Sequence, residues 1–432
     1  HEETQDYGKR KLFFSDTQII LKSIKFKNRS LSNNLKLNII KEVSNSAIPN
    51  KLNIKNISIN SKTIKKNDIF FAIKGKRVDG NKFISEAFKK KSSLAIVNKI
   101  NKDYPSSKQI KVDNTLNFLS KCSTILRENT DAKIISITGS CGKTTLKDMV
   151  GYTLGKISKT TYSQKSYNNK YGVPLSLFNL KHNDNFGVFE VGMDKKGEID
   201  NLTKIIKPDL GIITNISYAH SKNFKNINQI ASAKAEIMNN IKEGGIIVLN
   251  SDDNFYSYHK RLAMKKKLKV ISFGIDNKSS MARLIKIRKM KNKYELFFNI
   301  NNVNISFYSN NNNKSNLYNI LATLTLINPY QDIKRLKKNI FLGFKIPNGR
   351  GDISKIKLKD KQIFLVDETY NSNPLSLKTA IENYEGIESK NSKKYLILGD
   401  MLELGNHSIK QHKLISKIIN KTNINQVYVI GK

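Results

Sequence analysis

The sequence predicts an α/β protein of several domains, with a middle part built as a mostly parallel sheet covered by helices. At 432 residues the chain is long enough for two or three domains. Apolar runs alternate with segments of helical length between residues 132 and 328, and these runs are 134–137, 186–191, 210–213 and 246–249. The first run leads into a loop from Gly139 to Gly142, and a helical pattern opens at Lys143. Strand, glycine loop and helix therefore come in the order of a phosphate-binding turn.

The residues before this middle part form two different segments. Residues 1–30 are a lysine-rich pattern of strand, turn and strand that stands apart from the rest of the chain. From 31 to 131 the pattern predicts a compact mixed α/β domain. In it, 67–75 are expected to form a buried strand between two turns, and 83–91 have the spacing of a helix.

The middle domain is expected to span residues 132–346 and a third α/β domain residues 347–432. Residues 280–313 predict a β meander, and a helix is expected to begin near Asn316. Past the linker at 347–351, strands are expected at 363–366 and 395–398, with a helix from about Pro374. The chain stops just past a further strand, so we expect the third domain to be incomplete and the chain to be clipped.

The formal net charge of +41 has two interpretations. A strongly basic protein can bind nucleic acid or a membrane surface. Here, however, the lysines are spread along the whole length, arginines are few, and aromatic residues do not interleave with a basic stripe. We therefore favour the second interpretation, in which the charge reflects a lysine-rich composition and the protein has no nucleic-acid partner. The positive field of such a surface would also attract phosphorylated substrates.

Composition favours a cytoplasmic protein. No run approaches the ~18 apolar residues of a membrane span, so we expect none. The chain begins His1-Glu-Glu-Thr, which lacks the features of a signal peptide. The two cysteines, Cys122 and Cys141, are too few for a disulfide framework. We expect a reducing compartment.

The segment Thr138-Gly-Ser-Cys-Gly-Lys-Thr-Thr145 carries the strongest functional signal. In phosphate-binding loops, backbone N–H groups and the positive end of a helix dipole face the anion, a lysine reaches the outer phosphates, and a hydroxyl binds Mg²⁺. The full pattern would place a glycine where Ile137 stands, but the core Gly-x-x-Gly-Lys-Thr-Thr remains. We therefore predict an ATP site, with an ordinary strand–helix turn as the alternative.

Three residues outside the loop are candidates for the metal and the chemistry. Glu190 follows an apolar run, where a carboxylate suits Mg²⁺ or a water, although a helix-capping acid is the alternative. His220 follows another run and either acts together with Lys234 and Glu236 or is structural. Lys234 lies among small residues that would let it be buried, which would lower its pKa. An ordinary exposed helix lysine explains the same pattern equally well.

Polar residues in three further loops are weaker candidates. Asn168 and Asn169 could touch phosphates or substrate, or form a plain turn. Arg350 stands in a glycine-rich hinge and could clamp the γ-phosphate from a second domain. The polar residues after the strand at 363–366 could hold a ribose or a substrate amide, and they are Asp367, Tyr370, Asn371 and Asn373.

In order along the chain, these motifs resemble the Mur ligases. The segments that carry the resemblance are 138–145, 167–174, 190–199, 214–220, 233–237, 349–350, 367–374 and 398–405. The last two, with Tyr370-Asn-Ser-Asn-Pro374 and Leu398-Gly-Asp-Met-Leu-Glu-Leu-Gly405, are the most specific to the members that add D-alanyl-D-alanine. From about residue 35 onward, the resemblance implies a UDP-sugar-binding N-terminal domain, a central P-loop ATPase and a Rossmann-like C-terminal domain, here truncated, that brings the dipeptide.

The resemblance also implies roles for single residues. Lys143 and Thr144 would hold the ATP phosphates and Mg²⁺, Glu190 and His220 would be metal ligands, and Arg350 would clamp a phosphate. Lys234 matches a lysine that is carbamylated in relatives, which turns a cation into a carboxylate-like Mg²⁺ ligand. The remaining ATP contacts it implies are the loop residues, two adenine-side asparagines and a ribose-binding acid, namely Gly139, Ser140, Cys141, Gly142, Thr145, Asn316, Asn319 and Asp367.

Three features depart from the family pattern. Asn60-Ser61-Lys62 stands where the family has Asp-Ser-Arg near the uridine diphosphate, so Ser61 and Lys62 are implied substrate contacts, but the lysine lacks arginine's bidentate fork. Residues 1–30 resemble the tail of a MurE-type Mur ligase, which adds the third amino acid, and the family's closing Lys-Gly-Ser is missing after Lys432. We expect a monomer or a piece of a fusion with such a ligase.

The resemblance implies an ATP-dependent ligase that joins D-alanyl-D-alanine to a UDP-N-acetylmuramoyl-tripeptide through an acyl phosphate. Two alternatives stay open. A ligase like folylpolyglutamate synthase would begin near its phosphate loop, whereas 138 residues precede Gly139 here. A nucleic-acid-stimulated P-loop ATPase would need an acidic pair near residue 214, where Thr214-Asn215 stands.

Overall fold

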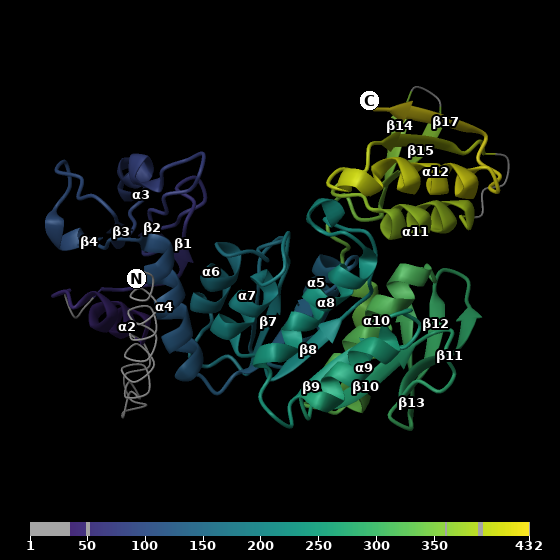
Figure 1. Ribbon diagram of the computed structural model, residues 1–432, viewed down its shortest axis with the longest axis horizontal. Coiled ribbons are helices and arrows are strands. Elements are labelled where there is room, and N and C mark those ends of the chain that lie inside the picture. Colours follow the sequence, from purple (N-terminus) through teal and green to yellow (C-terminus); the bar gives the residue numbers. More distant parts are fainter. Residues whose placement is uncertain (1–34, 49–51, 359–360, 388–391, 432) are drawn as a thin grey trace, which may run out of the picture. The chain divides into compact units, whose positions relative to one another are not determined.

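The computed structural model describes residues 35–48, 52–358, 361–387 and 392–431, so the predicted strands of residues 1–30 lie outside it. Internal contacts group the chain into two compact units. The first holds the residues up to Ala132 together with 170–184, and the second holds 133–169 and everything from Asn185 onward. Figure 1 labels the elements of both units.

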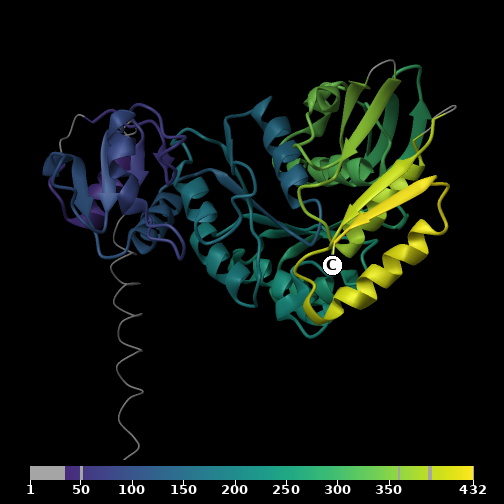
Figure 2. The same ribbon diagram turned by 90° about the horizontal axis from the view of Figure 1, so that it is seen from above.

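The first unit is built around a four-stranded parallel sheet in the order β1-β2-β3-β4 (Figure 2, purple and blue). Its strands are β1 (Ile57–Ser58), β2 (Ile69–Phe71), β3 (Leu94–Val97) and β4 (Gln109–Lys111). Its helices are α2 (Leu35–Ser44), α3 (Ile84–Lys89), α4 (Thr115–Glu128) and α6 (Gly172–Phe178). The fully buried strand β2 and the helix α3 confirm the strand and helix that were predicted within 67–75 and 83–91.

Residues 170–184, which the sequence analysis placed in the middle domain, group with the first unit because polar contacts tie them there. The Asn179 side chain pairs with both backbone groups of Ile57, accepting from its N–H at 2.8 Å and donating to its carbonyl at 3.0 Å. The Ser123 hydroxyl on α4 donates to the carbonyl of Pro174 on α6 at 2.8 Å. These are pairings between segments far apart in sequence, which local patterns do not reveal.

The second unit contains a nine-stranded sheet in the order β13-β12-β11-β10-β9-β8-β5-β7-β6. Neighbours from β11 through β6 run parallel, whereas β11, β12 and β13 form an antiparallel meander. This confirms the predicted parallel sheet and the meander at 280–313. The strands are β5 (Lys133–Thr138), β6 (Thr160–Tyr162), β7 (Phe186–Glu190), β8 (Leu210–Ile213), β9 (Ile246–Asn250), β10 (Lys269–Gly274), β11 (Ala282–Lys289), β12 (Tyr294–Ile300) and β13 (Val303–Ser309).

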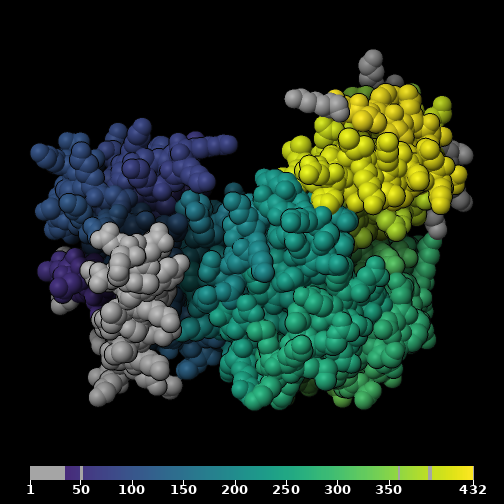
Figure 3. All heavy atoms as spheres, viewed as in Figure 1, coloured from purple at the N-terminus to yellow at the C-terminus, as the bar shows by residue number. Residues whose placement is uncertain are grey.

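In the described part of the chain, five helices accompany this sheet. They are α5 (Lys143–Gly155), α7 (Glu198–Ile206), α8 (Ile227–Ala235), α9 (Tyr256–Lys265) and α10 (Lys314–Ile327). Two of them, α5 and α10, share its main apolar core. Buried residues of α5 and α10, such as Met149 and Leu321, share the core with strand residues such as Ile135 and Val188. In the space-filling view these elements, in teal and green, form a continuous packed body (Figure 3). Across the described segments, every helix is too short or too polar to cross a membrane.

The last part of the second unit carries two pairs of strands and two helices. β14 (Asp352–Leu358) and β15 (Lys361–Asp367) are antiparallel, and β16 (Tyr395–Gly399) and β17 (Gln426–Ile430) are parallel. The helices are α11 (Pro374–Glu385) and α12 (Ser408–Ile419). The predicted strands at 363–366 and 395–398 and the helix from Pro374 are confirmed. Both sides of the boundary predicted at 346/347 belong to this unit.

Candidate active site

The loop that was predicted to bind phosphate joins β5 to α5. β5 ends at Thr138 and α5 begins at Lys143, with the glycine loop between them. Gly139 and Gly142 have φ angles of 145° and 79°, which glycine adopts without steric cost. A Cβ at Gly139 would lie 1.9 Å from Oγ1 of Thr214, so no larger residue fits. The first N–H groups of α5 have no intrahelical partners, which is the arrangement that binds phosphate oxygens.

The polar residues that follow β8 brace this loop. The backbone carbonyl of Asn215 accepts from the N–H of Ser140, and its side-chain Oδ1 accepts from the N–H of Cys141, both at 2.9 Å. The Thr214 hydroxyl donates to the carbonyl of Cys141 at 2.7 Å. The positions where a nucleic-acid-stimulated ATPase would need an acidic pair therefore shape the phosphate loop instead.

Thr144, Glu190 and Asn168 meet beside the loop. Glu190 is the last residue of β7, the strand that pairs with β5, and it is 1% exposed. One of its carboxylate oxygens accepts from the Thr144 hydroxyl and the other from the Asn168 amide, each at 2.7 Å. A hydroxyl and a buried carboxylate are the hard oxygen donors that suit Mg²⁺, so these residues fit the ion that the family implies. Asn169 is the next residue of the same loop.

Lys234 lies buried on α8, which confirms the burial that its small neighbours suggest. Burial, followed by the positive charge of Lys143, holds the pKa of Lys234 well below its usual value. Within the described ranges, no acceptor forms a hydrogen bond with its ammonium. Lys143, in contrast, donates to the carbonyl of Gly139 at 2.9 Å. Burial without an accepting group therefore disfavours the charged form of Lys234, whereas the ammonium of Lys143 is hydrogen-bonded within the loop.

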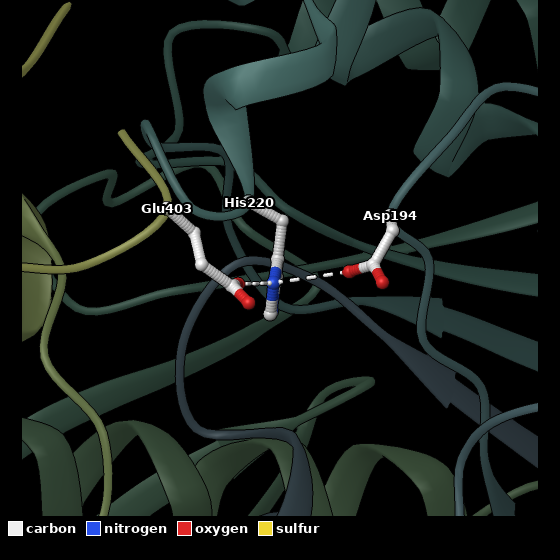
Figure 4. Close-up of side chains that lie close together, drawn as sticks. All are labelled: Asp194, His220 and Glu403. Atoms are coloured by element: carbon white, nitrogen blue, oxygen red, sulfur yellow. Dashed lines mark hydrogen bonds and ion pairs between the residues drawn. The ribbon is translucent and has the colours of Figure 1, made fainter. Parts of the chain in front are cut away.

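His220 lies between two carboxylates that the sequence analysis did not single out. Its Nδ1 contacts the carboxylate of Glu403 and lies 3.3 Å from a carboxylate oxygen of Asp194 (Figure 4). The three ligand atoms all lie within 4.8 Å of one another. Burial, followed by the charge of Lys143, lowers the pKa of His220, and the charge of Glu403 opposes this shift. The imidazole itself keeps 29% exposure, so it is reachable from solvent as well as from the two carboxylates. Its predicted metal role stays a prediction.

Ser166 joins three residues of the site. Its Oγ accepts from the Arg350 guanidinium at 3.2 Å and from the Tyr370 phenol at 2.7 Å, and it lies 3.2 Å from the Thr144 hydroxyl. The Arg350 guanidinium also stacks over the Tyr370 ring at 4.0 Å. The arginine of the predicted hinge therefore reaches the phosphate loop through a serine that the sequence analysis missed.

A pocket of about 550 Å³ opens next to the loop. Its wall contains Gly142 and several predicted residues, namely Cys141, Thr145, Asn316, Asn319, Arg350, Tyr370 and Asn371. Asp252, which accepts hydrogen bonds from Tyr318 and from three backbone N–H groups, forms part of the same wall. A cavity that combines apolar and polar side chains beside a phosphate loop suits the nucleoside half of a nucleotide.

The predicted residues at the end of β15 and after it have different surroundings. The Asp367 carboxylate accepts from the N–H and hydroxyl of Thr369, and Asp367 is not among the residues that line the pocket. Asn373 caps α11 and its Oδ1 accepts from the Cys141 thiol at 3.1 Å. Their predicted roles in ribose and substrate binding stay predictions.

In the first unit, Ser61 and Lys62 lie in a turn next to α3. The Ser61 hydroxyl donates to Glu86 at 2.7 Å, and the ammonium of Lys90 binds the carbonyl oxygens of both Ser61 and Lys62. The Lys62 side chain is exposed. Contact between these residues and a uridine diphosphate stays a prediction.

The sequence analysis missed Ser166, Asp194 and Glu403. Each lies inside or beside a segment that it had quoted: Ser166 directly precedes 167–174, Asp194 lies in 190–199, and Glu403 lies in 398–405. None of the three stands directly after an apolar run, which is where the sequence analysis looked for site residues. Their place in or beside these motifs is the signal that could have found them.

Comparison with known proteins assigns the chain to a group. Residues 137–327 match the family described as Mur ligase middle domain, and residues 53–123 match Mur ligase family, catalytic domain. A protein of Rickettsia prowazekii (strain Madrid E) named UDP-N-acetylmuramoyl-tripeptide--D-alanyl-D-alanine ligase is 32% identical over 89% of this chain and 84% of its own length.

Two solved structures share the fold. MurF from Acinetobacter baumannii is 24% identical with a TM-score of 0.75, and the alignment covers 91% of this chain and 85% of that one. The MurF ligase from Thermotoga maritima in complex with ADP is 26% identical with a TM-score of 0.72, over 88% of this chain and 85% of that one.

Proposed function

The chain belongs to the Mur ligase family, and on this premise we propose that it ligates D-alanyl-D-alanine to UDP-N-acetylmuramoyl-tripeptide with ATP, a step of peptidoglycan precursor synthesis. The relative that is named for this reaction matches 89% of the chain, including the part before the phosphate loop. The observation that carries the proposal is the contact of Thr144 with Glu190 beside that loop, because it joins a phosphate-binding turn to oxygen donors suited to Mg²⁺.

The proposed reaction has two steps. The terminal carboxylate of the tripeptide attacks the γ-phosphorus of ATP, so that an oxygen–phosphorus bond forms, the bond to the β,γ-bridging oxygen breaks, and ADP leaves. The amine of D-alanyl-D-alanine then attacks the carbonyl carbon of the acyl phosphate. A carbon–nitrogen bond forms, inorganic phosphate leaves with the electron pair of the carbon–oxygen bond, and the surplus proton of the amine passes to solvent.

The residues of the chain would contribute mainly charge and position. Lys143 and the N–H groups at the start of α5 would hold the outer phosphates. Arg350, which contacts Ser166 beside Thr144, would bind the phosphoryl group that is transferred. Asn316 and Asn319 would lie on the adenine side, since both line the pocket next to Gly142. Asp367 would bind the ribose.

We propose that Thr144, Glu190, His220 and Lys234 hold Mg²⁺, which when bound would neutralise the charge of the phosphoryl group. The lowered pKa of Lys234 supports a neutral amine that adds CO₂. A nitrogen–carbon bond would form and a proton would be released, leaving a carbamate. The oxygen atoms of the carbamate would be hard oxygen ligands, which suit Mg²⁺ better than the nitrogen of an amine.

The same proposal assigns a task to each predicted domain. Residues 31–131, with Ser61 and Lys62, would bind the UDP-sugar, and residues 132–346 would bind ATP. Residues 347–432 would bring the dipeptide, and the residues proposed to contact substrate near that domain are Asn168, Asn169, Tyr370, Asn371 and Asn373. We further propose that the protein acts in the cytoplasm, as a monomer or fused to a MurE-type ligase.

Release of inorganic phosphate tests the proposed reaction directly. With ATP, Mg²⁺ and the UDP-tripeptide present, we expect release to require D-alanyl-D-alanine. Lys143→Ala should abolish it, because the outer phosphates lose their cation. Lys156→Ala, an exposed position directly after the end of the same helix, is the matched control and should leave it unchanged. Normal turnover in Lys143→Ala would sink the assignment of the ATP site.

Parallel reactions separate the alternatives. Single-stranded DNA in place of the two substrates should give no stimulation, and stimulation by DNA alone would favour the nucleic-acid-stimulated ATPase. A folate with glutamate should also be inert. Activity with that pair would favour the ligase resembling folylpolyglutamate synthase.

A further inference from the structure

Two segments of the second unit bind each other next to the candidate metal site. One is residues 217–224, here called the His220 loop, and the other is residues 401–407, the Glu403 turn. The backbone N–H of Lys222 donates to the carbonyl of Glu403 at 2.9 Å, and the Ser221 hydroxyl donates to the carbonyl of Leu404 at 3.2 Å. The His407 ring contacts the carbonyl of Phe224 at 3.2 Å. These three hydrogen bonds join the two segments.

Apolar packing supports the same pairing. Tyr218 of the His220 loop packs against the small core of the last part of the chain, which includes Met401 and Leu404. Its ring also lies 4.8 Å from the ring of His407. Gly405 is held so close that an added Cβ would stand 2.8 Å from the Cα of Lys222. The Glu403 turn thus fits the His220 loop closely, and a larger residue at 405 would push the two apart.

The backbone is unusual at the two residues that face each other. His220 has a φ of 53° and Glu403 a φ of 63°, a region that residues other than glycine seldom adopt. Such conformations persist where the surroundings hold them, and they gather at functional sites. Here the left-handed backbone on both sides accompanies the direct contact between the His220 ring and the Glu403 carboxylate (Figure 4).

The contact engages only one nitrogen of the ring. Nδ1 faces Glu403, with Asp194 at 3.3 Å, whereas in the part of the chain that the structure describes nothing forms a hydrogen bond with Nε2. Lys222 lies 3.8 Å from the same carboxylate of Glu403. A metal-ligating histidine commonly donates its second N–H to a carboxylate, which fixes the tautomer and the orientation of the ring. The arrangement at His220 has this form.

We propose that Glu403 is a positioning residue, which accepts the Nδ1 proton of His220 and so reserves Nε2 for the nucleotide–metal site. The proposal rests on the proposed function in that His220 is taken as a metal ligand. Because Glu403 belongs to the last part of the chain and His220 to the loop after β8, the ligand is correctly oriented only while the Glu403 turn is docked. Docking of the part that would bring the dipeptide is thereby linked to the site that would activate the carboxylate.

The first test uses the metal-free protein and needs no turnover. Nitrogen-15 NMR of the histidine rings reports the tautomer, and comparison with His220→Gln assigns the signal. We expect the Nδ1–H form in the unchanged protein and a mixture enriched in Nε2–H in Glu403→Ala. Glu403→Gln keeps an acceptor and should retain more of the Nδ1–H form. Glu243→Gln removes an exposed acid that pairs with Lys267, and as the matched control it should change nothing.

Hydrogen exchange of the His220 loop reports docking. We expect exchange of residues 217–224 to rise about tenfold in Gly405→Ala, which separates the segments without removing Glu403. With substrates and Mg²⁺, Glu403→Ala should lower kcat about 10- to 100-fold with little change in the KM for ATP, and Glu403→Gln should recover part of it.

Two results would overturn the proposal. One is an unchanged Nδ1–H tautomer in Glu403→Ala, which would leave the orientation to Asp194 alone. The other is coordination of added Mn²⁺ by Nδ1, seen as selective broadening of that signal, which would make the three residues a metal site themselves. If the tautomer shifts as expected but the ligation assay fails, the positioning role stands and the proposed function falls.

Discussion

The middle part of the chain buries two lysines, one on α5 and one on α8. The first is surrounded by hydrogen-bond acceptors and, within the residues that the structure describes, the second is not. On α5, Lys147 is 0% exposed, and its ammonium donates to the Asp148 carboxylate at 2.5 Å and to the carbonyl oxygens of Ser163 and Lys165 at 2.5 and 2.9 Å. On α8, Lys234 is 1% exposed and meets no acceptor among the described residues.

The difference separates a lysine that ties two segments together from the lysine that we propose to carry the carbamate. Lys147 fastens α5 to residues 163–165, which lead directly into Ser166 and Asn168 of the site. Its charge is buried together with the groups that balance it. Lys234 lacks such groups, so burial and the charge of Lys143 disfavour its protonated form. Burial is common to both lysines, so the missing set of partners, and not burial, is what makes Lys234 the candidate for chemistry.

The largest effect should come from Lys234→Met, which replaces the amine by an apolar side chain of similar length. The rate of phosphate release should fall about 10³-fold, or about 4 kcal/mol, because the site loses a proposed metal ligand. The free energy of unfolding should rise by about 1 kcal/mol, because no polar group stays buried without a partner. Activity assays and urea denaturation measure the two effects.

Chemical rescue sharpens this result. In Lys234→Ala, added small carboxylic acids should restore part of the activity by occupying the place of the carbamate. The same acids should not improve Lys143→Ala, where a cation is missing. A strong loss of stability in Lys234→Met would contradict the contrast with Lys147.

Lys147→Met should have the opposite balance. We expect the free energy of unfolding to fall by about 3 kcal/mol, because Asp148 and two carbonyl oxygens lose their donor. This is the low end for a buried pair, since the Asp148 side chain keeps 22% exposure and can recruit water. Urea denaturation checks it, and the unchanged protein at the same pH is the reference. Stability equal to that of Lys234→Met would remove the distinction between the two regions.

The fold and the glycine loop between β5 and α5 could be predicted because their signals are local. Apolar runs identified β5, β7, β8 and β9, and Gly139 to Thr145 identified the turn between the first strand and its helix. Glu190 was found because it ends a run on the strand beside β5. The small residues around Lys234 indicated its burial, since they leave room for neighbours to pack over it.

The remaining features depend on contacts between distant segments. Lys147 was missed because two of its three acceptors are backbone carbonyls of an irregular segment, which no side-chain pattern reveals. Asp194 and Glu403 were missed because each stands in a loop. Glu403 reaches His220 through the pairing of the Glu403 turn with the His220 loop, and Asp194 reaches it from the segment between β7 and α7. The grouping of residues 170–184 with the first unit was missed for the same reason, because it depends on the hydrogen bonds between Asn179 and the distant Ile57.

Lys36 on α2 extends the comparison to the first unit as an intermediate case. Burial lowers its pKa to about 8, while Asp184 raises it and Lys181 lowers it further. The unfolded chain keeps a value near 10.5, so between pH 8 and 10.5 the unfolded state binds more protons and stability should rise with pH. Below pH 8 both states are protonated and the unfavourable charge is fully present.

Lys36→Met should therefore raise the free energy of unfolding by about 2 kcal/mol at pH 7, after allowance for partial solvation, and remove the rise toward pH 10. Urea denaturation followed by circular dichroism at pH 7, 8.5 and 10 tests this. Lys41→Met, on the same helix, is the control for lost charge. If Lys36→Met stabilises the protein equally at all three pH values, removal of the buried charge of Lys36 is not the cause of the stabilisation.

The smallest effect should come from Ser166→Ala. This variant separates the attachment of residues 163–166 to α5 from the contacts that Ser166 makes in the candidate site. Lys147 still holds residues 163–165 in this variant, so the free energy of unfolding should stay within about 0.5 kcal/mol. Thr144, Arg350 and Tyr370 lose a shared hydrogen-bond partner, which is worth about 1 kcal/mol, so the KM for ATP should rise about fivefold. Initial rates at varied ATP measure this, with the exposed Ser279→Ala as control.

A loss of stability as large as that of Lys147→Met would mean that Ser166 is itself an anchor of the segment. An unchanged KM would mean that Arg350 and Tyr370 reach the nucleotide without it.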